Sequence, residues 1–181
     1  MGTLFIISGA SGAGKTTLAT ELLKISRIKR VVTYTTRPPR SVEMNGEDYF
    51  FVSIKEFIKL ESSGFFLETA KFNEHCYGSP LSVIQELKTG QNWLIVTDLE
   101  GVKSIKIKHP EAVAVWIETS LSTLEKRMCE RGTESKQEIE NRIKLASEQI
   151  KEAHSMNEFS HIILNNAFDD ALFELLRIIE K

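Results

Sequence analysis

The chain has 181 residues, of which 41% are hydrophobic and 27% are charged, and its formal net charge at pH 7 is −2. This length and composition fit one globular domain with a sizeable core, and they exclude the disordered and fibrous classes. The near-neutral charge argues against binding to nucleic acid by bulk electrostatic attraction, whereas a small anionic ligand needs only a few well-placed cations.

Cysteine usage and hydropathy bear on the compartment. Cys76 and Cys129 lie far apart and form no C-x-x-C pair, so we expect reduced thiols rather than a disulfide framework or a zinc site. No apolar run approaches the roughly 18 residues that a membrane-spanning helix needs, and the run at 4–7 is too short for a signal peptide. We therefore predict a cytoplasmic protein without a membrane or nucleic-acid partner, and the sequence leaves its oligomeric state open.

Short apolar runs predict strands, and amphipathic or capped segments predict helices between them. In chain order, strands are expected at residues 4–7, 33–36, 49–52, 93–96, 113–117 and 162–164. Helices are expected from Thr16, from capping boxes that begin at Ser53, Ser122 and Ser135, and over 167–179. Each box has the S-x-x-E spacing, in which serine and glutamate satisfy each other's free backbone N–H groups.

Strands and helices alternate through most of the chain. This order predicts a parallel sheet with helices on both faces, in the α/β class. Residues 33–79 break the alternation, because strand candidates cluster there around one short helix. We interpret this stretch as a small α+β lobe inserted into a single domain that spans residues 1–181.

A complete G-x-x-x-x-G-K-[ST] motif lies between the first predicted strand and helix. Its members are Gly9, Ala10, Ser11, Gly12, Ala13, Gly14, Lys15 and Thr16, and Thr17 follows in the helix. Glycines let backbone N–H groups point at phosphate oxygens, and the helix N-terminus adds a favourable dipole. The lysine reaches the β- and γ-phosphates, and the threonine hydroxyl ligates Mg²⁺. A chance glycine-rich turn is the alternative, but the flanking strand and helix favour a phosphate-binding loop.

An acidic residue closes a neighbouring predicted strand. Asp98 follows the strand at 93–96, where a carboxylate typically holds Mg²⁺ directly or through water. The alternative is that Asp98 caps a helix that begins near Gly101; beside a full phosphate-binding loop the metal role is favoured. These two features indicate a nucleoside triphosphate and Mg²⁺, but GTPases, motor ATPases and small-molecule kinases all share them.

A second anion-binding feature lies at residues 37–40, with the sequence Arg-Pro-Pro-Arg. The two prolines fix φ and so restrict the turn that carries both guanidinium groups. Arginine forks match phosphate oxygens in a bidentate way. In isolation this turn is more typical of an exposed, solubilising loop.

With these residues in place, the chain resembles the guanylate kinase family over almost its whole length. The motifs that carry the resemblance occur in the family's order, at residues 9–17, 35–40, 45–49, 66–68, 77–79, 98–102 and 131–134. The resemblance implies a P-loop NTPase-type core at 1–32, 80–124 and 149–181, a GMP-binding lobe at 33–79 and a helical lid at 125–148. It also implies the reaction ATP + GMP ⇌ ADP + GDP with Mg²⁺, in purine nucleotide metabolism.

The resemblance further implies a role for each matching position. The GMP phosphate would be held by Arg37, Arg40, Tyr49 and Tyr77, and the guanine base by Thr33, Glu68 and Ser79. Lys15 would act on the transferring phosphoryl group, together with Arg131 and Arg142 from the lid. Asp98 would serve the metal, with Thr16, and the acceptor region.

The chemistry of guanine agrees with these roles. A carboxylate such as Glu68 can accept both N1–H and N2–H, and a hydroxyl such as that of Ser79 can donate to O6. Adenine would face the carboxylate with its N1 lone pair, and a site of this kind rejects the wrong base by about 10⁴ or more. Arg127 is equally typical of a solvated helix and of a phosphate-binding lid.

The chain departs from the family pattern at four positions. Thr33 replaces a serine, Ala10 a proline, Val96 an acidic residue and Thr69 an aromatic residue. Three other functions compete with the kinase reading: a non-catalytic guanylate-kinase-like scaffold, a kinase for another nucleoside monophosphate, and a GTPase switch. Lys15 argues against the scaffold, Glu68 with Ser79 argues for guanine, and no downstream Asn-Lys-x-Asp pattern supports a GTPase.

Overall fold

The central layer is a five-stranded sheet in the order β2-β7-β1-β8-β9. The structure, a computed structural model, describes residues 1–72, 74–131 and 135–180, without the side chains of residues 72 and 131. The strands are β1 (Leu4–Gly9), β2 (Lys29–Arg30), β7 (Trp93–Val96), β8 (Val113–Glu118) and β9 (Phe159–Leu164). Neighbouring strands pair in parallel, which confirms the predicted α/β class.

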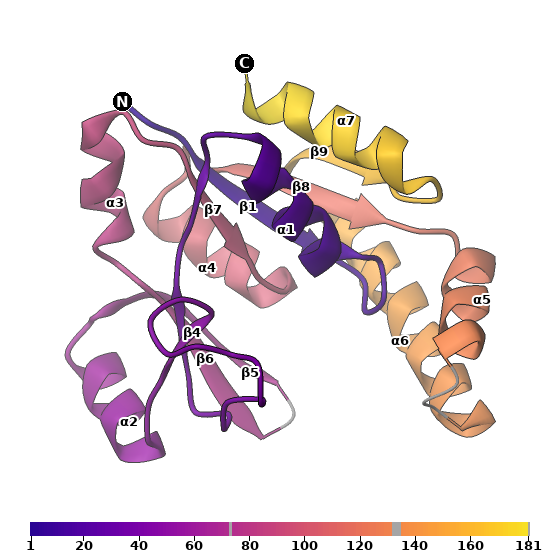
Figure 1. Cartoon of the computed structure of the whole chain (residues 1–181), viewed down its shortest axis with the longest axis horizontal. Helices are drawn as coiled ribbons and strands as arrows, with labels where there is room; N and C mark the ends of the chain where they lie inside the picture. The colour runs from indigo at the N-terminus through magenta and orange to yellow at the C-terminus, as the bar shows by residue number, and fades with distance from the viewer. Residues whose placement is uncertain (73, 132–134, 181) are drawn as a thin grey trace.

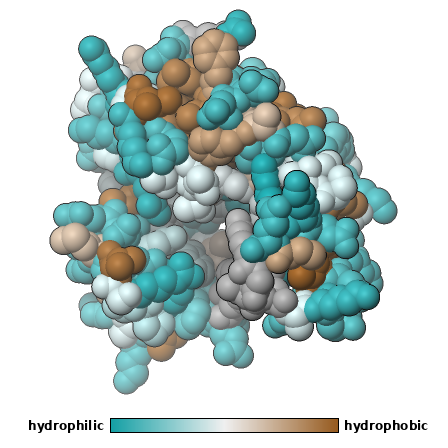
Figure 2. Space-filling view, turned by 45° about the vertical axis from the view of Figure 1, so that its right-hand side comes forward, coloured by the Kyte–Doolittle hydropathy of each residue, from teal (hydrophilic) through white to brown (hydrophobic). Residues whose placement is uncertain are grey.

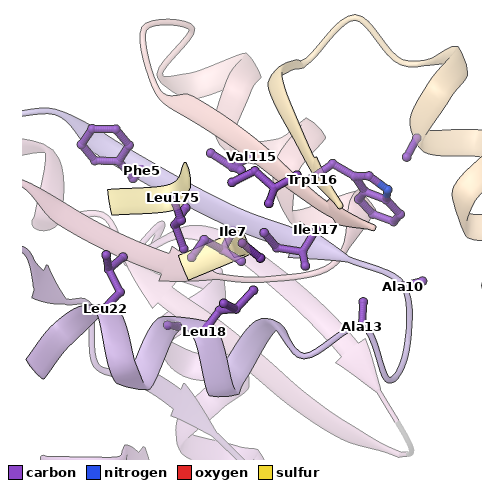
Figure 3. Packing of buried hydrophobic residues seen from close by; sticks show 14 of the residues in the cluster. Phe5, Ile7, Ala10, Ala13, Leu18, Leu22, Val115, Trp116, Ile117 and Leu175 are labelled. Carbon is purple, nitrogen blue, oxygen red and sulfur yellow. The ribbon is translucent and has the colours of Figure 1, made fainter. Parts of the chain in front are cut away.

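Helices cover both faces of this sheet because the side chains of a strand alternate between faces. In β1, Phe5 and Ile7 belong to one buried cluster with Leu18 and Leu22 of α1 (Lys15–Ile25). Figure 3 shows both leucines pointing from α1 toward Ile7 and the sheet. Leu4 and Ile6 of the same strand pack in a second cluster with α4 (Leu99–Lys108).

The remaining helices complete the core. Helix α7 (Phe168–Ile179) packs beside α1, and α3 (Val83–Glu86) leads through a short 3₁₀ turn at Leu87–Thr89 toward β7. Helix α5 (Leu121–Arg131) packs against α6 (Lys136–Ser155), and Figure 1 shows this pair extending away from the central sheet.

A second, four-stranded sheet in the order β4-β3-β6-β5 forms what we call the small lobe. It contains β3 (Thr33–Thr35), β4 (Tyr49–Phe51), α2 (Ile54–Ser62), β5 (Phe66–Phe72) and β6 (His75–Pro80). Its pairings are antiparallel except between β3 and β4, so it is of α+β type, as predicted for this insert. An aromatic cluster holds it together, in which Tyr34 stacks on Phe50 with ring centroids 4.7 Å apart.

Two of the three predicted capping boxes are confirmed and one is wrong. Ser53 and Ser135 each cap a helix and exchange hydrogen bonds with the glutamate three residues on. The box at Ser122 does not start its helix, because α5 begins at Leu121 and the Ser120 hydroxyl accepts from the Thr123 N–H at 3.3 Å. The strands β2, β5 and β6 were not predicted, since none is a continuous apolar run.

The molecular surface is hollowed in the lower half of the space-filling view (Figure 2). The space-filling view (Figure 2) shows this hollow, with hydrophilic residues predominating on the parts that flank it. In the described part of the chain, no helix is both long and apolar enough to cross a membrane.

Candidate active site

A cavity of about 360 Å³ lies where β1 and β7 end, between the central sheet and the small lobe. Crevices at the carboxyl ends of parallel strands are the usual ligand sites of open α/β sheets. The residues that line it and bear on function are Gly9, Ser11, Lys15, Thr16, Arg30, Thr33, Tyr49, Glu68, Tyr77, Asp98 and Gln149. Residues predicted to hold two different ligands therefore share one cavity.

The loop at residues 9–16 has the backbone conformation that its glycines predict. Gly12 and Gly14 adopt φ of 84° and 88°, in the left-handed region that favours glycine. A Cβ at residue 14 would also lie 2.5 Å from the Asn165 amide nitrogen. Helix α1 starts directly after Gly14, so the loop and the helix N-terminus have the geometry expected of a phosphate-binding site.

Buried polar residues that the sequence did not reveal hold this loop in place. The Asn165 side-chain amide donates to the Ala13 carbonyl at 2.7 Å, and the Thr119 hydroxyl approaches the same carbonyl at 3.3 Å. The Arg127 guanidinium donates to the Asn165 carbonyl at 3.0 Å. Arg127 thus holds Asn165, which in turn supports the loop. This role differs from both alternatives expected for Arg127, a solvated helix residue and a phosphate-binding lid residue. The available signal was that Thr119 and Asn165 directly follow β8 and β9.

The amine of Lys15 folds back onto its own loop. Its Nζ donates to the carbonyls of Gly9 at 2.6 Å and Ala10 at 3.0 Å. Burial lowers the pKa of Lys15 to about 8, and the nearby Asp98 carboxylate opposes that shift. A phosphate at this position would favour the charged amine and would replace the carbonyls as its partner.

Asp98 fulfils the helix-capping alternative and still lines the cavity. Its Oδ1 accepts from the Gly101 N–H at 2.8 Å, which caps α4. A carboxylate has further lone pairs after one such bond, so capping leaves Asp98 able to bind a metal ion or its water. Thr16 lines the same cavity, and this pair of oxygen donors is of the kind that Mg²⁺ takes from proteins.

Glu68 is a buried carboxylate with one unsatisfied oxygen. Its side chain is 3% exposed, its Oε1 accepts from the Ser79 hydroxyl at 2.7 Å, and its Oε2 has no partner among the described residues. Burial raises the pKa of Glu68 above its ordinary value, and the bond from Ser79 opposes that shift. Because the Ser79 hydrogen is used on Glu68, Ser79 orients the carboxylate in this structure rather than facing the cavity.

The two arginines predicted to bind phosphate lie outside the residues that line the cavity. The Arg37 guanidinium donates to both oxygens of Glu43, at 2.8 and 2.9 Å. Glu43 also accepts from the Arg40 N–H at 2.8 Å, and the hydrogen bond from Arg37 is the main reason that its pKa falls to about 2. The Arg40 side chain is 75% exposed. Sequence reasoning missed Glu43, which gave no signal of its own beyond lying near this turn.

Aromatic residues connect this pair to the cavity. Tyr49 and Tyr77 both line it, with ring centroids 6.2 Å apart. Arg37 lies 5.4 Å from the centroid of the Tyr49 ring, and so does Arg30, which was not predicted. Both distances are within the range of a cation–π interaction.

Helix α6 contacts the phosphate-binding loop at Ser11. Arg142 donates to the Ser11 hydroxyl at 3.0 Å, and the Ser11 N–H donates to the Gln149 side chain at 3.2 Å. Arg142 therefore contacts the phosphate-binding loop, and Gln149 is an additional contact; the action of Arg142 on the transferring phosphoryl group stays a prediction. Arg131 ends α5 and its side chain, like residues 132–134 of the predicted lid, lies outside the described residues.

A phosphate-binding loop that shares its cavity with a second lobe containing a buried carboxylate defines a P-loop kinase of nucleoside monophosphates. A family model described as guanylate kinase matches residues 1–181. The guanylate kinases of Prochlorococcus marinus and Hydrogenovibrio crunogenus are 38% and 40% identical to the chain. These alignments cover 98% and 96% of this chain and 97% and 85% of the relatives.

A solved structure agrees with these relatives. The crystal structure of guanylate kinase from Anaplasma phagocytophilum is 25% identical and superposes with a TM-score of 0.79, covering 99% of this chain and 85% of that one. The chain belongs to the guanylate kinase family and is a nucleoside monophosphate kinase that transfers a phosphoryl group from ATP to GMP.

Proposed function

We propose that ATP binds at the phosphate-binding loop, that GMP binds against the small lobe, and that the γ-phosphoryl group passes directly between them. The buried Glu68 carboxylate, with one oxygen unpaired in the cavity that Lys15 also lines, is the observation that carries this assignment. Such a transfer needs positioning and charge stabilisation rather than a covalent intermediate.

On the donor side, residues 9–17 surround the ATP phosphates. Lys15 exchanges the carbonyls of Gly9 and Ala10 for phosphate oxygens. The Thr16 hydroxyl and the Asp98 carboxylate would hold Mg²⁺, with Asp98 acting directly or through water. When bound, the ion neutralises charge that develops on the phosphates.

On the acceptor side, the base and the phosphate bind to different residues. Glu68 accepts the N1–H and N2–H groups of guanine, and Ser79 keeps the carboxylate oriented. Thr33, which lines the same cavity as Glu68, contributes to binding of the base. Tyr49 and Tyr77 bind the GMP phosphate from the cavity wall. Arg37 and Arg40 bind it after closure, once the phosphate competes with Glu43 for Arg37.

Closure involves three parts of one domain. Residues 1–32, 80–124 and 149–181 form the core, 33–79 the GMP-binding lobe, and 125–148 a lid that delivers Arg131 and Arg142 to the transferring phosphoryl group. The contact between Arg142 and Ser11 supports this direction of approach. Closure excludes water, which would otherwise hydrolyse ATP. The chain is expected to act in the cytoplasm on these small-molecule substrates.

A coupled assay of ADP release tests the assignment. The purified chain is supplied with MgATP and, in turn, GMP, dGMP, AMP, CMP, UMP and dTMP. We expect GMP to give the highest kcat/KM, and chelation of Mg²⁺ to abolish turnover. Faster turnover with AMP or dTMP than with GMP would contradict the assignment of Glu68 to the base.

A further inference from the structure

The cations that face the cavity differ from those that the family resemblance implies for the acceptor. Among the described residues that line it, the basic side chains are those of Lys15 and Arg30. Arg37 is held by Glu43, and Arg40 is largely exposed. Of the two cations that line the cavity, Arg30 is therefore the one that lies against Tyr49 of the small lobe.

Arg30 is placed by the central sheet and not by the small lobe. It ends β2, an edge strand of two residues, and pairs with Leu94 of β7. From there its guanidinium reaches the Tyr49 ring of the small lobe, at 5.4 Å from the ring centroid. Arg30 thus bridges the two sheets at the point where Tyr49 and Tyr77 line the cavity.

The charge of Arg30 has no acidic partner in the part of the chain that the structure describes. The ion pairs found there involve other residues, and the contact that Arg30 does make is with an aromatic face. Glu68 and Asp98 also line this cavity, but neither is paired with Arg30. A guanidinium that is not paired with a carboxylate is suited to an anionic ligand, because its fork matches the oxygens of a phosphate.

We propose that Arg30 is a further binding residue for the acceptor's phosphate monoester, contributed by the core. This inference rests on the proposed function, in which that phosphate lies against Tyr49 and Tyr77. Because Arg30 belongs to the sheet that also carries the phosphate-binding loop, it stands on the core side of the acceptor phosphate. There its positive charge offsets the repulsion between the two anionic substrates.

Equilibrium binding of GMP and of guanosine tests this role. Arg30→Met removes the charge and keeps an apolar stem, while Arg27→Met makes the same charge change at an exposed position three residues earlier. We expect Arg30→Met to weaken GMP binding about tenfold, the effect of losing one charge-assisted hydrogen bond. Guanosine lacks the phosphate, so its binding should change less than about twofold by the same reasoning. MgATP binding should be unchanged, and Arg27→Met should behave as the wild type.

Two outcomes would overturn the proposal. One is GMP binding by Arg30→Met within twofold of the wild type, where tenfold is expected. The other is an equal loss for GMP and guanosine, which would mean a distorted pocket. If Arg30→Met does not fold, Arg30→Lys decides, since it keeps the charge: it should retain most of the GMP affinity lost by an Arg30→Gln variant. The turnover of GMP by the wild type tests the proposed function independently. If the wild type phosphorylates GMP and either outcome above is found, the role of Arg30 is wrong but the proposed function stands.

Discussion

Replacing Glu68 by glutamine should remove guanine recognition without destabilising the fold. In the proposed complex the carboxylate accepts two N–H groups of guanine, and Ser79 holds it through a 2.7 Å hydrogen bond. Glutamine keeps one acceptor oxygen but turns an NH₂ group toward a guanine N–H. One charge-assisted bond is lost and one buried donor is left unpaired, together about 3–4 kcal/mol, or roughly a 10²- to 10³-fold fall in kcat/KM for GMP.

The stability of this variant should move in the opposite direction from its activity. Burial raises the pKa of Glu68, which means that the charged form is disfavoured in the folded, unliganded chain. Glutamine is uncharged and can still accept from Ser79. We therefore expect the Tm of Glu68→Gln to equal or exceed that of the wild type.

Steady-state kinetics with three acceptors check the base recognition. IMP lacks the N2 amine, so its kcat/KM should fall less than that of GMP, and the low rate with AMP should not fall. Glu47→Gln, an exposed substitution in the same lobe, is the matched control. An unchanged ratio of GMP to IMP in Glu68→Gln would refute the assignment.

The dependence on pH follows from the same carboxylate. Its raised pKa means that protonation, and with it loss of GMP binding, begins at a higher pH than for an ordinary glutamate as the solution is acidified. The kcat/KM profile of the wild type for GMP should therefore show an acidic limb that Glu68→Gln lacks.

Three further predictions concern the groups around the phosphates. Since the pKa of Lys15 is about 8, MgATP binding to the free chain should weaken as the pH rises from 7 to 9, and titration calorimetry should show no such trend for Lys15→Met. Asn165→Ala leaves the Ala13 carbonyl short of its closest partner, so thermal denaturation should show a loss of about 1–3 kcal/mol, and KM for ATP should rise. Glu43→Ala removes the carboxylate with which the GMP phosphate competes for Arg37, and steady-state assays should show KM for GMP falling severalfold while KM for ATP stays constant.

The features that could be predicted from the sequence depend on neighbouring residues. The phosphate-binding loop is one example, because its glycines, lysine and flanking apolar residues are contiguous. The box at Ser122 shows the limit of local pattern: Ser120 lies two residues earlier and provides the first hydroxyl that the helix can use. The parallel sheet was predictable from the alternation of elements, which needs no knowledge of strand order.

The features that escaped prediction depend on contacts between distant segments. Asn165 donates a hydrogen bond to Ala13, which lies 152 residues earlier in the chain, and no local sequence pattern at either residue predicts this bond. Arg30 lies in a strand of two residues, too short to show any periodicity. The partners of Arg37 and Ser79 were also beyond reach, because a motif names residues that bind a ligand and not the contacts they make without it.

Those contacts suggest why selectivity should reside mainly in the base. Lys15 and Arg37 already have partners, two carbonyls and a carboxylate, so a phosphate that binds them replaces existing interactions. The binding free energy gained from such an exchange is only the difference between the energies of the two sets of hydrogen bonds. The unpaired oxygen of Glu68 has no partner to give up within the described chain. The free-energy cost of removing this oxygen from water is already met when the chain folds, so the hydrogen bond from a guanine N–H is a net gain. Adenine would present a lone pair to the same oxygen and leave it unpaired. The complex with adenine would therefore gain no hydrogen bond there and would add electrostatic repulsion.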